Sequence, residues 1–177
     1  MKYYESLEKF KTYNIVLLCG LYGAGKTEFA STYFKGSGLY RVSRLELRKL
    51  MYEMTHFGES WEAEKFNEED DVLAKHVERK VVEHFLQIKR NVLIINTFMT
   101  KKSRQRFVNI AKETKKTIGA IFLDTPLDVC IAQSKRLNTA IPENVIRQLH
   151  SRKELPTKLE GYNDVLIIND FSLSSNG

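Results

Sequence analysis

Cysteine is scarce in this sequence, which has only Cys19 and Cys130 among its 177 residues. The two lie far apart, each inside an apolar stretch, which is typical of buried thiols rather than of a disulfide or a metal pair. A chain of this length buries enough apolar surface to fold without such crosslinks. The composition therefore argues against a disulfide scaffold and against a zinc-stabilised module.

Long apolar runs are also missing. The longest, residues 15–19 and 92–95, are far shorter than the roughly 20 residues that cross a bilayer as a helix. Residues 1–11 lack the apolar segment of a signal peptide, and the chain has no internal repeat or low-complexity block. We therefore expect a cytoplasmic protein without a membrane partner.

The rest of the composition is that of an ordinary globular protein, with 42% hydrophobic and 28% charged residues. A length of 177 residues predicts one domain. The 28 Lys and Arg residues outnumber the 22 Asp and Glu residues, which gives a net charge of +6. This balance fits a polyanionic partner such as a nucleic acid or a nucleotide, although solubility alone would explain it equally well.

Apolar segments alternate with amphipathic segments along the chain. We predict strands at residues 14–19, 39–43, 91–96, 117–124 and 164–168. Helical spacing of apolar residues predicts helices at 2–12, 26–34, 44–55, 69–90, 101–115, 126–137 and 142–150. Irregular segments are expected at 56–67, 138–141 and 151–163. This order predicts an α/β fold of three layers, a mainly parallel five-stranded sheet flanked by helices, with ligands beyond the carboxyl ends of the strands.

Residues 20–27 read GLYGAGKT, a complete G-x-x-x-x-G-K-T phosphate loop between a predicted strand and a predicted helix. Its glycines let successive backbone N–H groups point at phosphate oxygens, and the helix adds the positive end of its dipole. The lysine is expected to bridge the β- and γ-phosphates, and the threonine hydroxyl to bind Mg²⁺. The sequence thus predicts ATP or GTP with Mg²⁺ as ligands. The predicted nucleotide site comprises Gly20, Leu21, Tyr22, Gly23, Ala24, Gly25, Lys26 and Thr27.

Together with this loop, the order of further segments resembles the AAA-type P-loop kinases typified by polynucleotide 5′-hydroxyl kinase and the zeta-toxin group. The segments are SRLELRKLMY (43–52), NVLIINT (91–97), KKSRQRFVNIAKE (101–113), IFLDTPLDVCIAQSKR (121–136), IPENVIRQL (141–149) and ELPTKLEGYNDVLII (154–168). The resemblance covers nearly the whole chain from residue 14. It implies a single P-loop kinase domain over residues 1–177, with an N-terminal helix at 1–12 and a polar tail at 170–177.

The resemblance also implies the activity and some of the residues that serve it. The expected reaction moves the γ-phosphoryl group of ATP to a hydroxyl, most readily a polynucleotide 5′-hydroxyl, which makes a nucleic acid a candidate partner. Arg48 matches the arginine that binds a substrate phosphate, and Thr97 keeps the position beside that phosphate. Arg136 matches one of two lid arginines that neutralise the transferring phosphoryl group, while Ala132 stands in place of the other.

Two carboxylates of this family pattern are replaced. Leu45 stands where an aspartate would accept the proton of the attacking hydroxyl. Either the adjacent Glu46 takes over as the base through a rotation of the helix start, or the acceptor arrives differently, or the reaction is slow. Asn96 replaces an aspartate beside the metal, so Thr27 and Asn96 are the expected metal-site residues. If Glu46 is not the base, the next candidates are at the start of the long predicted helix, Asp70 and Asp71.

These departures leave several functions open. The alternatives to an active polynucleotide kinase are a catalytically impaired nucleotide-binding module, an ATPase whose acceptor is water, and a kinase of a nucleotide or another small molecule. Two weaker features bear on the acceptor. Trp61 lies in an irregular segment that could cover the acceptor site, and the predicted helix at 101–115 begins with a basic cluster that either contacts nucleic acid or is simply solvated: Lys101, Lys102, Arg104 and Arg106.

Overall fold

The computed structural model describes residues 3–65, 67–137 and 141–171, and within them five strands form one sheet. The strands are β1 (Ile15–Gly20), β2 (Tyr40–Ser43), β3 (Val92–Ile95), β4 (Ile118–Leu123) and β5 (Asp164–Ile168). Their order is β2-β3-β1-β4-β5, and every neighbouring pair is parallel. Ile15 of the central strand lies opposite Val92 and Ile118. The predicted α/β fold with a parallel five-stranded sheet is confirmed.

Seven α-helices flank the sheet in the described part of the chain, with two 3₁₀ turns, η1 (Ala63–Lys65) and η2 (Lys158–Glu160). The helices are α1 (Tyr4–Phe10), α2 (Lys26–Phe34), α3 (Arg44–Thr55), α4 (Glu68–Gln87), α5 (Lys101–Thr114), α6 (Leu127–Arg136) and α7 (Glu143–Ser151). Polar side chains fix three of the starts, because Ser43, Asn67 and Thr100 each accept a hydrogen bond from the backbone N–H three residues further on. None of the described helices has the length and apolarity needed to cross a membrane.

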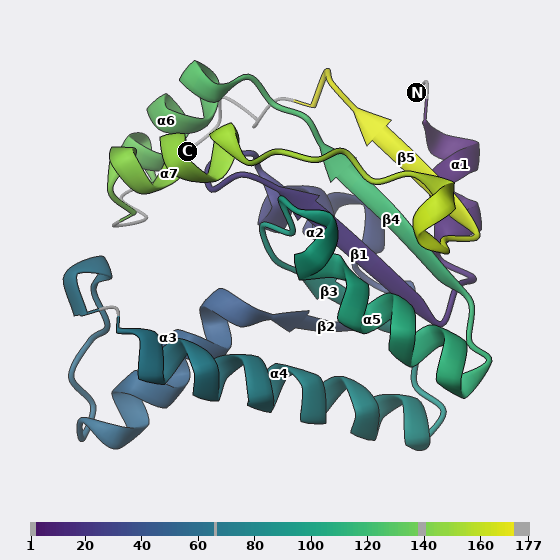
Figure 1. The fold of residues 1–177 in the computed structure, drawn as a ribbon, viewed down its shortest axis with the longest axis horizontal. Helices are drawn as coiled ribbons and strands as arrows, with labels where there is room; N and C mark the ends of the chain where they lie inside the picture. The colour runs from purple at the N-terminus through teal and green to yellow at the C-terminus, as the bar shows by residue number, and fades with distance from the viewer. Residues whose placement is uncertain (1–2, 66, 138–140, 172–177) are drawn as a thin grey trace.

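Every residue of β1, β3 and β4 is buried. Both faces of the centre of the sheet are therefore covered, as the predicted three layers require. Figure 1 shows α3 and α4 side by side next to β2, and α6 and α7 together at the end toward which the strands point. The segments that follow the strands meet at this carboxyl end.

Two aromatic residues are more buried than the sequence predicted. Trp61 lies in the segment expected to be irregular surface, yet only 8% of it is exposed. Phe171, assigned to the polar tail, packs edge-on against Phe29 of α2 with ring centroids 5.1 Å apart. Most of the predicted loop at 138–141 and of the tail at 170–177 lies outside the described residues. The expectation of two free, buried cysteines is confirmed.

Candidate active site

The phosphate loop joins the end of β1 to the start of α2. Its glycines Gly20, Gly23 and Gly25 have φ angles of 146°, 82° and 88°, in the region that side chains rarely adopt. A Cβ atom on Gly23 would also lie 2.1 Å from the carbonyl oxygen of Cys130. The loop is therefore curled as the motif predicts, and this curl fits a phosphate cradle.

Lys26 and Thr27, which follow these glycines, are suited to bind a nucleotide phosphate and its metal ion. The Lys26 ammonium donates to the carbonyl oxygens of Gly20 and Leu21 over 2.8 and 2.7 Å, which fixes it inside the loop. Burial lowers the pKa of Lys26 to about 8, so a bound anion would favour its charged form. Thr27 is exposed in the first turn of α2, where its hydroxyl is open to a ligand.

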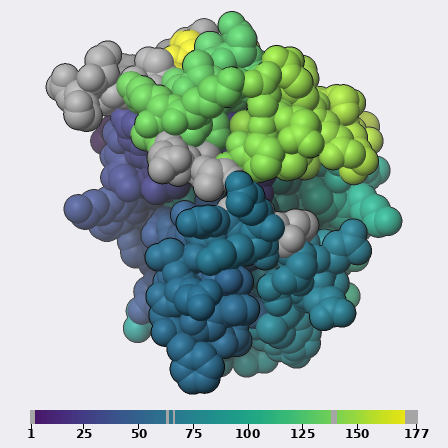
Figure 2. Space-filling view, turned by 90° about the vertical axis from the view of Figure 1, so that its left-hand side faces the viewer, coloured from purple at the N-terminus to yellow at the C-terminus, as the bar shows by residue number. Residues whose placement is uncertain are grey.

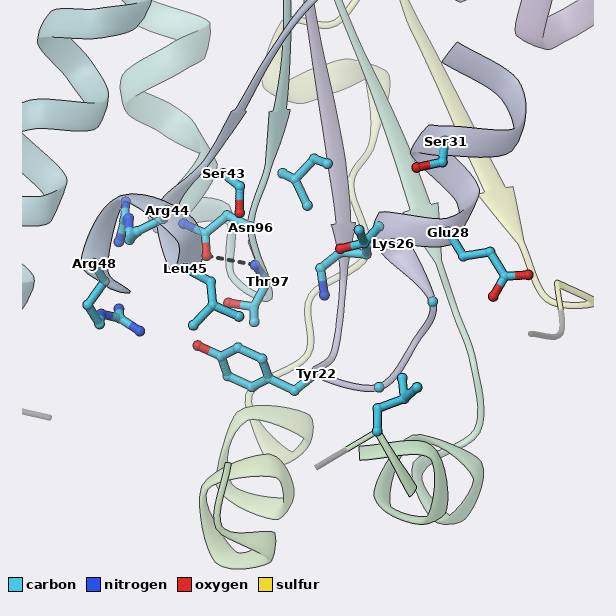
Figure 3. A pocket seen from close by; sticks show the side chains of 15 residues that line it. Tyr22, Lys26, Glu28, Ser31, Ser43, Arg44, Leu45, Arg48, Asn96 and Thr97 are labelled. Carbon is cyan, nitrogen blue, oxygen red and sulfur yellow. Dashed lines mark hydrogen bonds between the residues drawn. The ribbon is translucent and has the colours of Figure 1, made fainter. Parts of the chain in front are cut away.

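A pocket of about 380 Å³ lies between this loop and the ends of β2 and β3. Figure 3 shows Leu45 directed into it, near Thr97 and Tyr22. The pocket thus brings the side chain that replaces the family aspartate together with eight predicted site residues: Tyr22, Gly23, Gly25, Lys26, Thr27, Arg48, Asn96 and Thr97.

Asn96 already has a structural role in the pocket. Its side-chain oxygen accepts a hydrogen bond of 2.8 Å from the Thr97 backbone N–H (Figure 3), which orients the carboxamide at the end of β3. Across the described ranges, no group of three His, Cys, Asp or Glu side chains could hold a metal ion. A Mg²⁺ ion beside Thr27 and Asn96 would therefore depend on phosphate and water oxygens for most of its ligands.

Two predicted catalytic residues lie outside the lining of this pocket. Glu46 is exposed, and both of its carboxylate oxygens accept hydrogen bonds from the Arg41 guanidinium at 2.6 and 2.9 Å. Arg136 is exposed at the end of α6. Of the alternative bases, Asp70 is half-buried and lines neither this pocket nor its neighbour, whereas Asp71 lines a second pocket.

This second pocket has a volume of about 720 Å³ and adjoins the first. Its walls come from α3, α4, the start of α5 and α7. Figure 2 shows the blue α3–α4 segment facing the green α6–α7 segment across this side of the molecule. The two pockets share one wall, made by Tyr22, Arg44, Arg48, Asn96 and Thr97.

Arg48 and Asp71 form a half-buried ion pair in the second pocket. The Arg48 Nη2 lies 2.5 Å from an Asp71 oxygen, and the Lys75 ammonium lies 3.1 Å from the other. Burial opposes the charge on both partners, but Tyr22 and Asp71 outweigh it and raise the pKa of Arg48. Arg48 and Lys75 likewise outweigh burial and lower the pKa of Asp71. Both groups are therefore charged at neutral pH.

Glu78 organises the adjoining wall and is a residue that the sequence reasoning missed. Its side chain is fully buried, and it accepts hydrogen bonds from Arg44 at 3.0 and 3.1 Å and from Arg106. One carboxylate thus holds two guanidinium groups, which leaves an excess positive charge. A signal was present in the sequence, because Glu78 lies at four-residue spacing between Ala74 and Val82 on the buried face of α4.

Fold and site together define a protein with the P-loop kinase fold. The sequence model of the AAA domain family matches residues 15–156, and the chain belongs to this family. A comparison with curated proteins found no match.

Solved structures share this fold at low sequence identity. A candidate kinase from Chloroflexus aurantiacus is 17% identical with a TM-score of 0.68, over 89% of this chain and 86% of its own. A chain of the Pnkp1/Rnl/Hen1 RNA repair complex is 22% identical with a TM-score of 0.62, over 78% of this chain but only 43% of its own. A gluconokinase from Sinorhizobium meliloti is 13% identical with a TM-score of 0.58, over 87% and 81%. These matches do not single out the zeta-toxin group.

Proposed function

We propose that this protein is an ATP-dependent kinase that transfers the γ-phosphoryl group to a hydroxyl acceptor, with a polynucleotide 5′-hydroxyl as the preferred acceptor. The observation that carries the proposal is the wall shared by the two pockets. At this wall, a nucleotide held by the phosphate loop would lie next to an acceptor in the larger pocket. Phosphoryl transfer needs little covalent help from a protein beyond such positioning and charge stabilisation.

In this proposal the glycine loop and Lys26 hold the ATP phosphates. Thr27, with Asn96 through water, would hold a Mg²⁺ ion, which supplies charge neutralisation between the phosphates when it is bound. Arg48 and Thr97 hold a phosphate of the acceptor. Arg136 contributes its charge once α6 moves toward the nucleotide, a lid motion of the kind common in kinases.

The acceptor is proposed from the charge of the larger pocket. Its lining includes six basic side chains and the single carboxylate of Asp71, which suits an acceptor that carries phosphate. The structural match to a chain of an RNA repair complex supports a nucleic acid. The match to a gluconokinase supports the alternative, a small-molecule acceptor. The cytoplasmic location expected from the sequence stays a prediction.

A catalytically impaired nucleotide-binding module is the second candidate, and specific observations favour it. Leu45 presents an apolar side chain to the pocket, and the Glu46 carboxylate is held by Arg41. We propose Asp71 as the remaining base candidate, because it lines a pocket, whereas Glu46 and Asp70 do not. Its lowered pKa makes it a weak base, so slow turnover is expected even if Asp71 serves.

Radiolabelled ATP incubated with a panel of acceptors tests the proposal. The panel comprises 5′-hydroxyl oligonucleotides, nucleosides, sugars and water. We expect slow labelling of the oligonucleotide 5′ end, and faster labelling when Leu45→Asp and Asn96→Asp restore the carboxylates. Preferential labelling of a sugar would move the assignment to a small-molecule kinase, and release of phosphate alone would make the protein an ATPase.

The base is tested by a matched pair of variants. Asp71→Asn should slow transfer by roughly 10²-fold, the lower end of the usual loss for a positioned base. Glu46→Gln should leave transfer nearly unchanged, because Glu46 is exposed and held by Arg41. The opposite ranking would restore Glu46 as the base.

A further inference from the structure

The basic start of α5 contains two arginines with different surroundings. Arg104 is fully buried, and its guanidinium donates to the carbonyl oxygens of Phe98 and Glu154 at 2.7 and 2.9 Å and to Glu160 at 2.6 Å. These bonds join α5 to the segment at 154–160, so Arg104 holds the fold together. It is not a residue that a ligand can reach.

Arg106, two residues further on, lines the larger pocket instead. Its side chain is 26% exposed and pairs with the buried Glu78. Its Nε is buried and has no hydrogen-bond partner among the described residues. Arg106 thus carries one donor that the fold leaves unpaired, on a side chain that lines a pocket large enough for a ligand.

The positive charge around Arg106 is only partly compensated. Burial lowers the pKa of Arg106, and the nearby Arg44 lowers it further, against the opposing effect of Glu78. Lys102 and Arg152 line the same pocket, and no ion pair involves either of them in the part of the chain that the structure describes. A bound anion would relieve this crowding of like charges.

Arg48 and Arg106 are anchored separately. Asp71 holds Arg48, whereas Glu78 holds Arg106 together with Arg44. Each of the two arginines is thereby fixed on the wall of one pocket by a different carboxylate. Because different carboxylates hold them, the two guanidinium groups can each make charge-assisted hydrogen bonds to a phosphate of their own.

We propose that Arg106, positioned by Glu78, binds a second phosphate of the acceptor, beyond the phosphate assigned to Arg48. The inference rests on the proposed kinase function and deepens it. The acceptor is then a nucleic-acid strand that places at least two phosphates in the pocket, rather than a sugar or a mononucleotide.

The test uses acceptors that share a 5′-hydroxyl and differ in phosphate number. These are a nucleoside 3′-monophosphate, a dinucleotide with a 3′-phosphate and a trinucleotide with a 3′-phosphate. With MgATP and the full chain, kcat/KM should rise roughly ten-fold from one phosphate to two, the value of one charge-assisted hydrogen bond. The rise should come from KM, because the second phosphate lies away from the reacting hydroxyl.

Variants separate binding from a structural role. Arg106→Gln should lose this ten-fold gain and keep kcat/KM on the one-phosphate acceptor within about two-fold. Lys112→Gln is the matched control, since Lys112 is an exposed cation on the same helix outside the pocket lining. Arg106→Lys should keep the salt dependence of binding while losing part of the gain. Glu78→Gln should also reduce the gain, because Arg106 then loses the carboxylate that positions it.

Fluorescence anisotropy of the same acceptors without ATP keeps this inference separate from the kinase activity. If no acceptor is phosphorylated, the proposed function fails, yet the gain in affinity from the second phosphate still reports on Arg106. Binding should also become less salt-dependent in Arg106→Gln, by a slope of about 0.7 for one single-strand phosphate contact. An equal gain in the wild type and Arg106→Gln, or no gain in the wild type by either assay, would overturn the proposal.

Discussion

The phosphate loop and the wall of the acceptor pocket are both suited to bind anions, but they are built differently. The loop is one continuous stretch, residues 20–27, whose curl comes from glycine backbone and whose charge comes from Lys26. The wall instead takes its charge from arginines on α3 and α5, held by carboxylates on α4. Loss of one residue therefore has a local effect in the loop, whereas loss of a buried carboxylate in the wall affects several residues at once.

Replacement of Lys26 should have the largest effect on function. Lys26→Ala removes the charged side chain of the loop, so transfer should fall by at least about 10²-fold and ATP–Mg²⁺ should bind more weakly. Radiolabel transfer and calorimetry measure the two quantities. Lys35→Ala, just beyond α2 and exposed, is the control and should change neither. Unchanged affinity and unchanged turnover in Lys26→Ala would refute the assignment of the loop.

Replacement of Glu78 should have the largest effect on stability. Glu78→Gln leaves Arg44 and Arg106 without their buried countercharge, and removal of one partner of a buried pair costs about 3–5 kcal/mol. Urea denaturation measures the free energy of unfolding. Glu83→Gln, on the same helix in a partly exposed pair with Arg79, should cost under about 1 kcal/mol. Equal losses would mean that the acceptor wall does not depend on its buried carboxylate.

Alanine substitutions at two glycines, again measured by urea denaturation, test the conformation of the loop. Gly23 and Gly36 have similar φ angles of 82° and 80°, so alanine meets the same backbone strain, about 1–2 kcal/mol, at either position. An added Cβ meets open space at Gly36 but the Cys130 carbonyl at Gly23. Gly23→Ala should therefore destabilise the protein more than Gly36→Ala and should also weaken nucleotide binding. Indistinguishable variants would show that the loop relaxes around a side chain.

Replacement of Asp164, a carboxylate that is more exposed than Glu78, should have the smallest effect on stability. Lys158, Lys9 and Tyr13 hold its pKa well below the usual range. The stabilisation is then present above the unfolded-state pKa of about 3.9 and is lost as the pH falls through the lower folded-state pKa. Because solvent screens the ion pairs of Asp164, Asp164→Asn should lower the free energy of unfolding by only about 1 kcal/mol at pH 7. Unfolding midpoints measured from pH 7 down to pH 2 should converge for the variant and the wild type.

The same contrast between the two regions explains what the sequence could predict. Continuous apolar strands and a contiguous motif reveal the sheet, the loop and its place at the end of β1 without tertiary information. Arg44, Glu78 and Arg106 belong to three helices and are 34 and 28 residues apart in the two hydrogen-bonded pairs. Only the packing of α3, α4 and α5 brings them together, so no local spacing could show the cluster.

The orientation of the helices decides which of the three side chains Leu45, Glu46 and Asp71 reaches a pocket. Ser43 caps α3, and successive helical residues then point about 100° apart. This phase directs Leu45 into the pocket and leaves Glu46 outside the lining, beside Arg41. Asp71 enters the site from α4, a helix whose start could be located in the sequence but whose position relative to α3 could not.

Transfer of label from γ-radiolabelled ATP to a 5′-hydroxyl oligonucleotide by the wild-type protein tests the central claim most directly. We predict that the label appears on the 5′ end, slowly, and that labelling requires Mg²⁺ and an unblocked 5′-hydroxyl. Tight ATP binding with no label on any hydroxyl acceptor in the panel would contradict it, and the protein would then be a nucleotide-binding module.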